Sequence, residues 1–179
     1  MAQAKSAGKE IEFLFFEGDS KLVAEHGKGA GEAEIMEFIF QNSELIKSVD
    51  CFYKLTGRVI IKNLDTVLKK CKQQINYFQF HSKRNTSSPF VESVFYKMNC
   101  ADFLQLKNMK YAVNDRAGIY FEHTVWQKLQ ENNISYHFFP VYPVRSGVSG
   151  STGSSYDESW KRLLVKRILC RLRVLEHFY

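Results

Sequence analysis

Hydrophobic and polar residues follow patterns that predict both strands and helices along this chain. Short runs rich in aromatic and β-branched residues predict strands over 10–19, 34–42, 75–80, 118–126 and 133–144. Two prolines in the last run, Pro140 and Pro143, place that strand at a sheet edge or at its own end. Apolar residues at helical spacing predict helices over 63–74, 90–104 and 157–179.

The helix expected over 63–74 has the clearest local signals. One stripe with lysines opposite comprises Leu64, Val67, Leu68 and Cys71, and Asn63 precedes it as an N-cap residue. The glycine-rich stretch 25–34 is expected to be a loop. It is not a phosphate-binding loop, because no Ser or Thr follows its Gly-Lys pair at the required distance.

The C-terminal stretch predicts an amphipathic helix that follows a flexible Gly/Ser-rich linker over 146–155. Its apolar stripe comprises Trp160, Leu164, Ile168, Leu172 and Leu175. Lysines and arginines flank this stripe. The helix therefore either packs back on the preceding domain or pairs with a helix of a partner, and the stripe is the candidate partner interface.

Composition limits the possible classes of protein. With 179 residues, of which 45% are hydrophobic and 25% charged, the chain has a globular composition and a length suited to one domain. No apolar run approaches the roughly 20 residues that span a bilayer. We expect a flexible N-terminus over 1–9, an α+β domain over 10–145, the linker over 146–155 and a separate helix over 156–179.

The net charge of +6 is distributed unevenly, which raises nucleic-acid binding as one alternative function. The candidate phosphate contacts are Lys69, Lys70, Lys72, Lys83 and Arg84. No nucleic-acid reader motif accompanies them. The 4 cysteines lie far apart without CxxC spacing, so we expect reduced thiols rather than a zinc or disulfide framework.

The stretch "YFQFHSKRNTSSPFVES" (77–93) resembles the metal-binding motif of JAMM-type isopeptidases, in which two histidines and an aspartate bind zinc. Here Phe80, His81 and Ser82 match that motif. Lys83 stands at the second histidine and Val94 at the aspartate, and the nearest acid is Glu92. The motif is therefore degenerate, and we expect no bound metal, no cofactor and no catalysis. A degenerate zinc isopeptidase that uses His81, Glu92 and a third ligand remains an alternative.

A wider resemblance covers "FYKLTGRV", the helix "NLDTVLKKCKQQ", the strand "INYFQF", "SKRNTSSPFVESVFYKMN" and "YFEHTVWQKLQENNISYHFFPVYPVRSG". In this order they resemble the MPN-minus domain of the Abraxas and Abro family, the non-catalytic scaffold subunits of deubiquitinase assemblies. The resemblance implies a three-layer α/β/α MPN-like fold with a central mixed β-sheet, followed by a C-terminal amphipathic helix.

The same resemblance implies a heterodimer with a catalytic JAMM deubiquitinase subunit that cleaves ubiquitin chains, in the nucleus or the cytoplasm. Two departures qualify it. The first strand and helix of the family have no counterpart before "EFLFFEGD". In addition, His81 and Ser82 are closer to the catalytic motif than in most scaffold members.

Overall fold

The computed structural model describes residues 8–79, 89–149 and 153–172, and the backbone alone at residue 172. Two compact units divide the chain. One combines the N-terminal part up to residue 49 with 107–121, and the other combines 50–106 with the part from 122 onward. Each unit thus contains segments that are distant in the sequence.

The first unit is helical. It contains α2 (Ser20–His26), α3 (Lys28–Asn42), α4 (Glu44–Lys47), α7 (Met109–Ala112) and the 3-10 turn η1 (Asp115–Ala117). Asp19 caps α2 by accepting the amide protons of Lys21 and Leu22. Small buried residues of α3, Ala30 and Ala33, allow close packing against α7, and an ion pair of 3.2 Å joins Lys110 to Glu37.

The second unit is built on a four-stranded mixed sheet of order β1-β4-β3-β5. The strands are β1 (Cys51–Leu55), β4 (Phe95–Asn99), β3 (Asn76–Phe78) and β5 (Tyr136–Phe138). The β1/β4 and β4/β3 pairs are antiparallel, whereas β3 and β5 run parallel. A separate antiparallel pair joins β2 (Val59–Ile61) to β6 (Arg145–Gly147).

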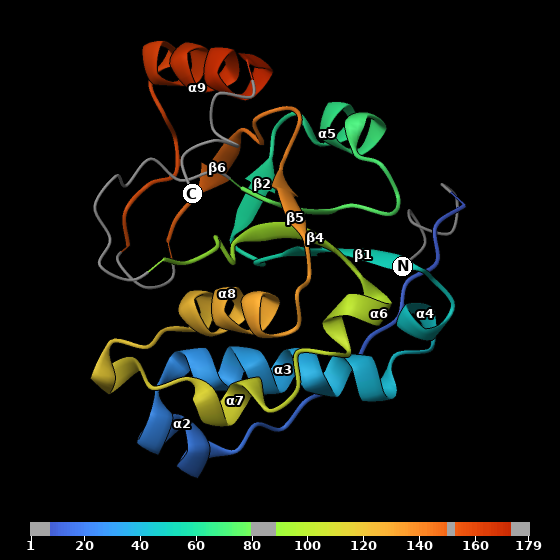
Figure 1. The fold of residues 1–179 in the computed structure, drawn as a ribbon, viewed down its shortest axis with the longest axis vertical. Helices are drawn as coiled ribbons and strands as arrows, with labels where there is room; N and C mark the ends of the chain where they lie inside the picture. Colours follow the sequence, from blue (N-terminus) through green and yellow to red (C-terminus); the bar gives the residue numbers. More distant parts are fainter. Residues whose placement is uncertain (1–7, 80–88, 150–152, 173–179) are drawn as a thin grey trace. The chain divides into compact units, whose positions relative to one another are not determined.

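Helices accompany the sheet on both sides. Figure 1 shows α5 (Leu64–Lys70) on one side and α8 (Phe121–Glu131) on the other, with α6 (Cys100–Phe103) after β4 and α9 (Trp160–Leu172) near the C-terminal end. Side chains alternate along β4. Phe95 packs with Val67 in the core beside α5, whereas Tyr96 stacks on Phe78 on the opposite face. The α+β class and the mixed sheet are therefore confirmed.

Several predicted elements are confirmed. The helix over 63–74 and the strand over 75–80 appear as α5 and β3, and the C-terminal helix appears as α9. Part of the strand predicted over 133–144 is β5. The expected linker over 146–155 begins instead within β6, which pairs with β2 through its own backbone.

Two strand predictions are wrong, because residues 34–42 belong to α3 and most of 118–126 belongs to α8. In both places the aromatic and β-branched content suggested a strand, but burial follows a helical period. Phe121, Val125 and Leu129 are buried at intervals of four residues. The glycine-rich loop expected over 25–34 is likewise wrong, since α3 begins at Lys28.

The helix predicted over 90–104 is also wrong. Residues 95–99 form β4, which lies between β1 and β3 and pairs with both, and only Cys100–Phe103 is helical. Long-range pairing here overrides the local helical spacing. The strand predicted over 10–19 makes no ladder with any other described residue.

Glycines allow an aspartate to approach the start of α3. Gly27 has φ of 98°, and Asp115 Oδ2 accepts the amide proton of Gly29 at 3.1 Å. A Cβ atom on Gly27 would lie 2.4 Å from the Asp115 side chain. The Asp115 carboxylate consequently sits at the positive end of the helix dipole, where a negative charge is favourable.

Candidate interaction site on the C-terminal helix

One face of α9 rests on the unit to which the helix belongs. Leu163, Lys166, Leu169 and Cys170 are half-buried, and they recur at the spacing of a single helical face. The helix begins where the amide of Leu163 donates to the carbonyl of Ser159 at 3.1 Å. This inner face is what fixes the rotation of α9 about its own axis.

A partly buried polar contact anchors the helix at its centre. Lys166 Nζ donates to the hydroxyl of Tyr142 at 2.8 Å and also pairs with the Glu158 carboxylate. Tyr142 is only 2% exposed. Burial of Lys166 opposes its charge, but its hydrogen bonds to Glu158 and Tyr142 outweigh that effect and raise its pKa. Lys166 therefore stays charged and bound.

The opposite face of α9 is apolar and exposed. Trp160 is 69% exposed and Ile168 is 49% exposed, and the exposed fractions of Leu164 and Val165 lie between these values. We call these four residues the α9 stripe. Exposed cations flank it: Lys161, Arg162, Arg167 and Arg171. The Lys161 ammonium lies 5.9 Å from the centre of the Trp160 ring.

The structure brings three of the five predicted interface residues together. Trp160, Leu164 and Ile168 lie on the α9 stripe, whereas the Leu172 side chain and Leu175 lie outside the described residues. Sequence reasoning missed Val165, which follows Leu164 in the sequence and is exposed on the same face of α9. It also missed the anchor, because nothing in the local pattern links Lys166 to Tyr142.

The degenerate zinc motif is only partly described, because Phe80, His81, Ser82 and Lys83 lie outside the described residues. Its two remaining positions are engaged elsewhere. Glu92 forms an ion pair with Arg145 at 3.2 Å, and the Arg145 guanidinium lies 4.8 Å from the centre of the Tyr156 ring. Val94 packs against the core beside α5. A carboxylate binds zinc through free oxygen atoms, and the positive charge of Arg145 beside Glu92 would repel a zinc ion.

No cluster of three or more histidines, cysteines, aspartates or glutamates suited to a metal ion occurs within 8–79, 89–149 and 153–172. Over the same ranges, no helix is both long enough and apolar enough to cross a membrane.

The candidate nucleic-acid residues are not gathered into a described site. Lys69 and Lys70 end α5, where cations favour the negative end of the helix dipole, and Lys72 follows them. All three side chains are exposed. Lys83 and Arg84 lie outside the described residues.

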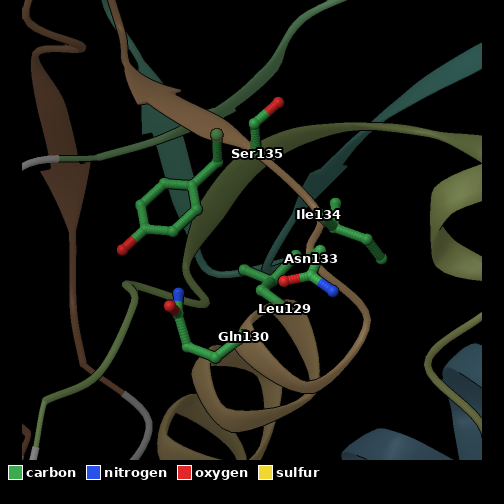
Figure 2. Close-up of a pocket in the computed structure, with 6 residues that line it drawn as sticks. Leu129, Gln130, Asn133, Ile134 and Ser135 are labelled. Atoms are coloured by element: carbon green, nitrogen blue, oxygen red, sulfur yellow. The ribbon is translucent and has the colours of Figure 1, made fainter.

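A hollow of about 340 Å³ lies where α8 ends and β5 begins. Figure 2 shows Leu129 and Gln130 on the last helical turn, and Asn133, Ile134 and Ser135 on the chain that leads into the strand. Tyr136 completes the lining. These side chains offer amides, hydroxyls and apolar surface but no carboxylate, imidazole, thiol or amine. No imidazole, carboxylate or amine among the lining residues stands ready to activate the Ser135 or Tyr136 hydroxyl.

A buried lysine is the most unusual polar group of the second unit. Lys97 on β4 is 1% exposed, and its ammonium donates to the carbonyls of Gln73 and Ile75, the latter at 2.8 Å. Tyr53 and Tyr77 stand opposite it on the neighbouring strands. Both carbonyls belong to the turn between α5 and β3. The ammonium thus secures that turn and is not free to act as a nucleophile.

Comparison of the chain with protein-family models, with curated proteins and with solved structures yields no match in any of the three.

The seating of α9 predicts slow alkylation of one thiol. Burial raises the pKa of Cys170 to about 11 from its ordinary value of 9.0, while the nearby Lys166 charge lowers it only in part. Near pH 8 the thiolate of Cys170 should be about a hundredfold rarer than in the unfolded chain. Mass spectrometry after timed iodoacetamide treatment should show this difference. Equal labelling rates in buffer and in urea would contradict a seated helix.

Proposed function

We propose that this protein is a non-catalytic scaffold subunit whose α9 stripe binds a partner protein. The observation that supports the proposal is the exposure of large apolar side chains on a helix that is anchored from its other face. Full burial of a large apolar side chain contributes about 1.5–3 kcal/mol, so a few such residues make a productive association surface.

The chemistry of the remaining candidates agrees with a non-catalytic role. Glu92 is held by Arg145, and Val94 has no donor atom for a metal. The hollow beside α8 carries no imidazole, carboxylate or amine among its lining residues to activate a hydroxyl. Lys97 is bound by main-chain carbonyls. These described groups are engaged in structural contacts, which is compatible with the proposed scaffold role.

The partner that we propose is a catalytic JAMM deubiquitinase subunit. This part rests on the resemblance to the MPN-minus scaffold family and not on the interaction surface. The pieces that resemble the family include α5 and β3 in the expected order, whereas β4 stands where the resemblance implies a helix. The α9 stripe is the surface through which the two subunits would pair.

Affinity purification of the full chain with quantitative mass spectrometry tests this proposal. The wild type should enrich a JAMM metalloprotease, and the double change Leu164→Asp and Ile168→Asp should reduce its recovery at least about tenfold, because two charges would enter the apolar contact. Both residues are about half exposed, so the fold should persist, and circular dichroism checks this. Leu104→Asp, at a residue 58% exposed outside α9, is the matched control.

Three results would contradict the proposal. Recovery of the protease could be absent, or it could be unaffected by the change in the stripe. The purified wild type could cleave lysine-63-linked ubiquitin chains without a partner, which would favour the zinc isopeptidase. Binding of RNA or DNA that weakens steeply with salt would instead favour the nucleic-acid alternative.

A further inference from the structure

Residues 9–17 in the first unit have the side-chain pattern of a strand. Ile11, Phe13 and Phe15 are exposed by 50%, 64% and 92%, whereas the residues between them are half-buried. This period of two is typical of a strand with one face packed. Figure 1 shows the segment as an uncoiled chain that leads from the N-terminal end toward α2.

The inner face of this segment is fixed to the helices of its own unit. Glu12 accepts a hydrogen bond of 2.5 Å from the Ser43 hydroxyl and one of 3.0 Å from the amide of Glu44 at the start of α4. The Phe16 ring lies 5.1 Å from the ring of Phe38 on α3. These contacts hold the outer residues Ile11, Phe13 and Phe15 toward solvent.

The main-chain N–H and C=O groups of the segment are available for pairing with another strand. Within the described part of the chain, no backbone N–H or C=O of residues 10–18 bonds to another backbone group. A row of unpaired main-chain groups beside exposed apolar side chains is the edge to which another strand adds. The segment is therefore suited to bind an extended strand.

The side chains along the outer face are complementary to those of a second copy that runs in the opposite direction. If two copies pair antiparallel about Phe13, Phe13 meets Phe13, and Ile11 meets Phe15 twice. The charges at the ends also match, since Lys9 then faces Glu17 on both sides of the twofold axis. Aromatic pairs and opposite charges are both favourable across neighbouring strands.

Other registers are less favourable. Pairing about Glu12 sets Glu12 against its own copy, and pairing about Leu14 sets Glu17 against Ile11. A slip by one residue would pair the inner face of one copy with the outer face of the other. Parallel pairing places Lys9 opposite Lys9. Only the register about Phe13 joins every outer residue to a complementary one.

We propose that residues 9–17 form a homodimer interface, in which the segments of two copies pair as antiparallel strands about a twofold axis at Phe13. Two-stranded ribbons are marginal alone, but here the inner face of each strand already packs on its own helices. The interface goes beyond the proposed scaffold role and uses no residue of α9. Loss of partner recovery through α9 and loss of self-association can therefore be measured separately.

Oxidative cross-linking of single-cysteine additions tests the register. Phe13→Cys should form a disulfide-linked dimer with itself, because directly opposite residues bring their Cβ atoms within reach of a disulfide. Ile11→Cys and Phe15→Cys should each fail to cross-link alone but should cross-link when mixed. The wild type, with its 4 native cysteines, gives the background. Equal cross-linking of Ile11→Cys alone and in the mixture would overturn the register.

Charge reversal provides the second test, with sedimentation equilibrium of the full chain as the measurement. Lys9→Glu should weaken the dimer about tenfold, because two attractive pairs become repulsive. Glu17→Lys should do the same, and the double reversal should restore wild-type affinity. Phe13→Asp, at an exposed site, should give a folded monomer. A wild type that stays monomeric at its highest soluble concentration, or a dimer unaffected by Phe13→Asp, would overturn the interface.

Discussion

Replacing Lys97 by methionine is expected to lower the free energy of unfolding by about 3 kcal/mol, measured by urea denaturation. Methionine fills a similar volume but donates no hydrogen bond. The carbonyls of Gln73 and Ile75 would lose the ammonium that binds them now. An acceptor that loses its partner at such a partly buried site costs up to about 1–3 kcal/mol, and removal of the buried charge offsets part of that cost.

A matched control separates this effect from the loss of a positive charge. Lys69→Met changes the same side chain at an exposed position of α5, so it should alter stability by no more than about 0.5 kcal/mol. The Lys97 change should also speed hydrogen exchange in the turn between α5 and β3. Equal stabilities of the two variants would show that Lys97 does not secure this turn.

Gly147→Ala is expected to destabilise the second unit by about 3 kcal/mol. Gly147 in β6 has φ of 124°, a conformation that residues with a side chain rarely adopt. An added Cβ would lie 2.2 Å from the carbonyl oxygen of Arg58. Because that atom belongs to the backbone, the β2–β6 pair must separate to make room. The carbonyl of Gly147 also accepts the amide proton of Tyr156, so the chain before α9 should loosen as well.

Two other glycines distinguish the strain from the clash. Gly153 has φ of 67° but no atom within 4 Å of an added Cβ, so Gly153→Ala should cost only about 1 kcal/mol. Gly57 has neither constraint, and Gly57→Ala should change stability by less than about 0.5 kcal/mol. Thermal or urea unfolding of the three variants measures this order. A Gly147 variant no less stable than the Gly153 variant would contradict the close approach.

Elements with strong local periodicity could be predicted from the sequence. Helices α5 and α9 carry apolar residues at helical intervals, and β3 is a short apolar run after a helix. Helices α3 and α8 could not be predicted in this way, because their aromatic and β-branched residues favour strands locally. Burial of one whole face of the helix determines the secondary structure of these two segments, because strand propensity is weak compared with that packing.

Long-range pairing accounts for the other differences. Strand β4 is a strand because β1 and β3 lie on both sides of it, and residues 95–99 alone do not indicate those neighbours. The ion pair of Glu92 with Arg145 spans 53 positions of the sequence. Lys97 stands in an apolar stretch without any motif, so its burial and its bonds to the α5–β3 turn carry no sequence signal.

The sequence by itself determined that the C-terminal stretch is an amphipathic helix with Trp160, Leu164 and Ile168 on one stripe, because helical spacing is a local property. It left open whether this stripe packs on the rest of its own unit. Tertiary structure decided that it does not. Tyr142 and Glu158 bind Lys166 on the opposite face of α9, which turns the apolar stripe toward solvent. The rotation of a helix depends on groups that folding brings to it from elsewhere in the chain.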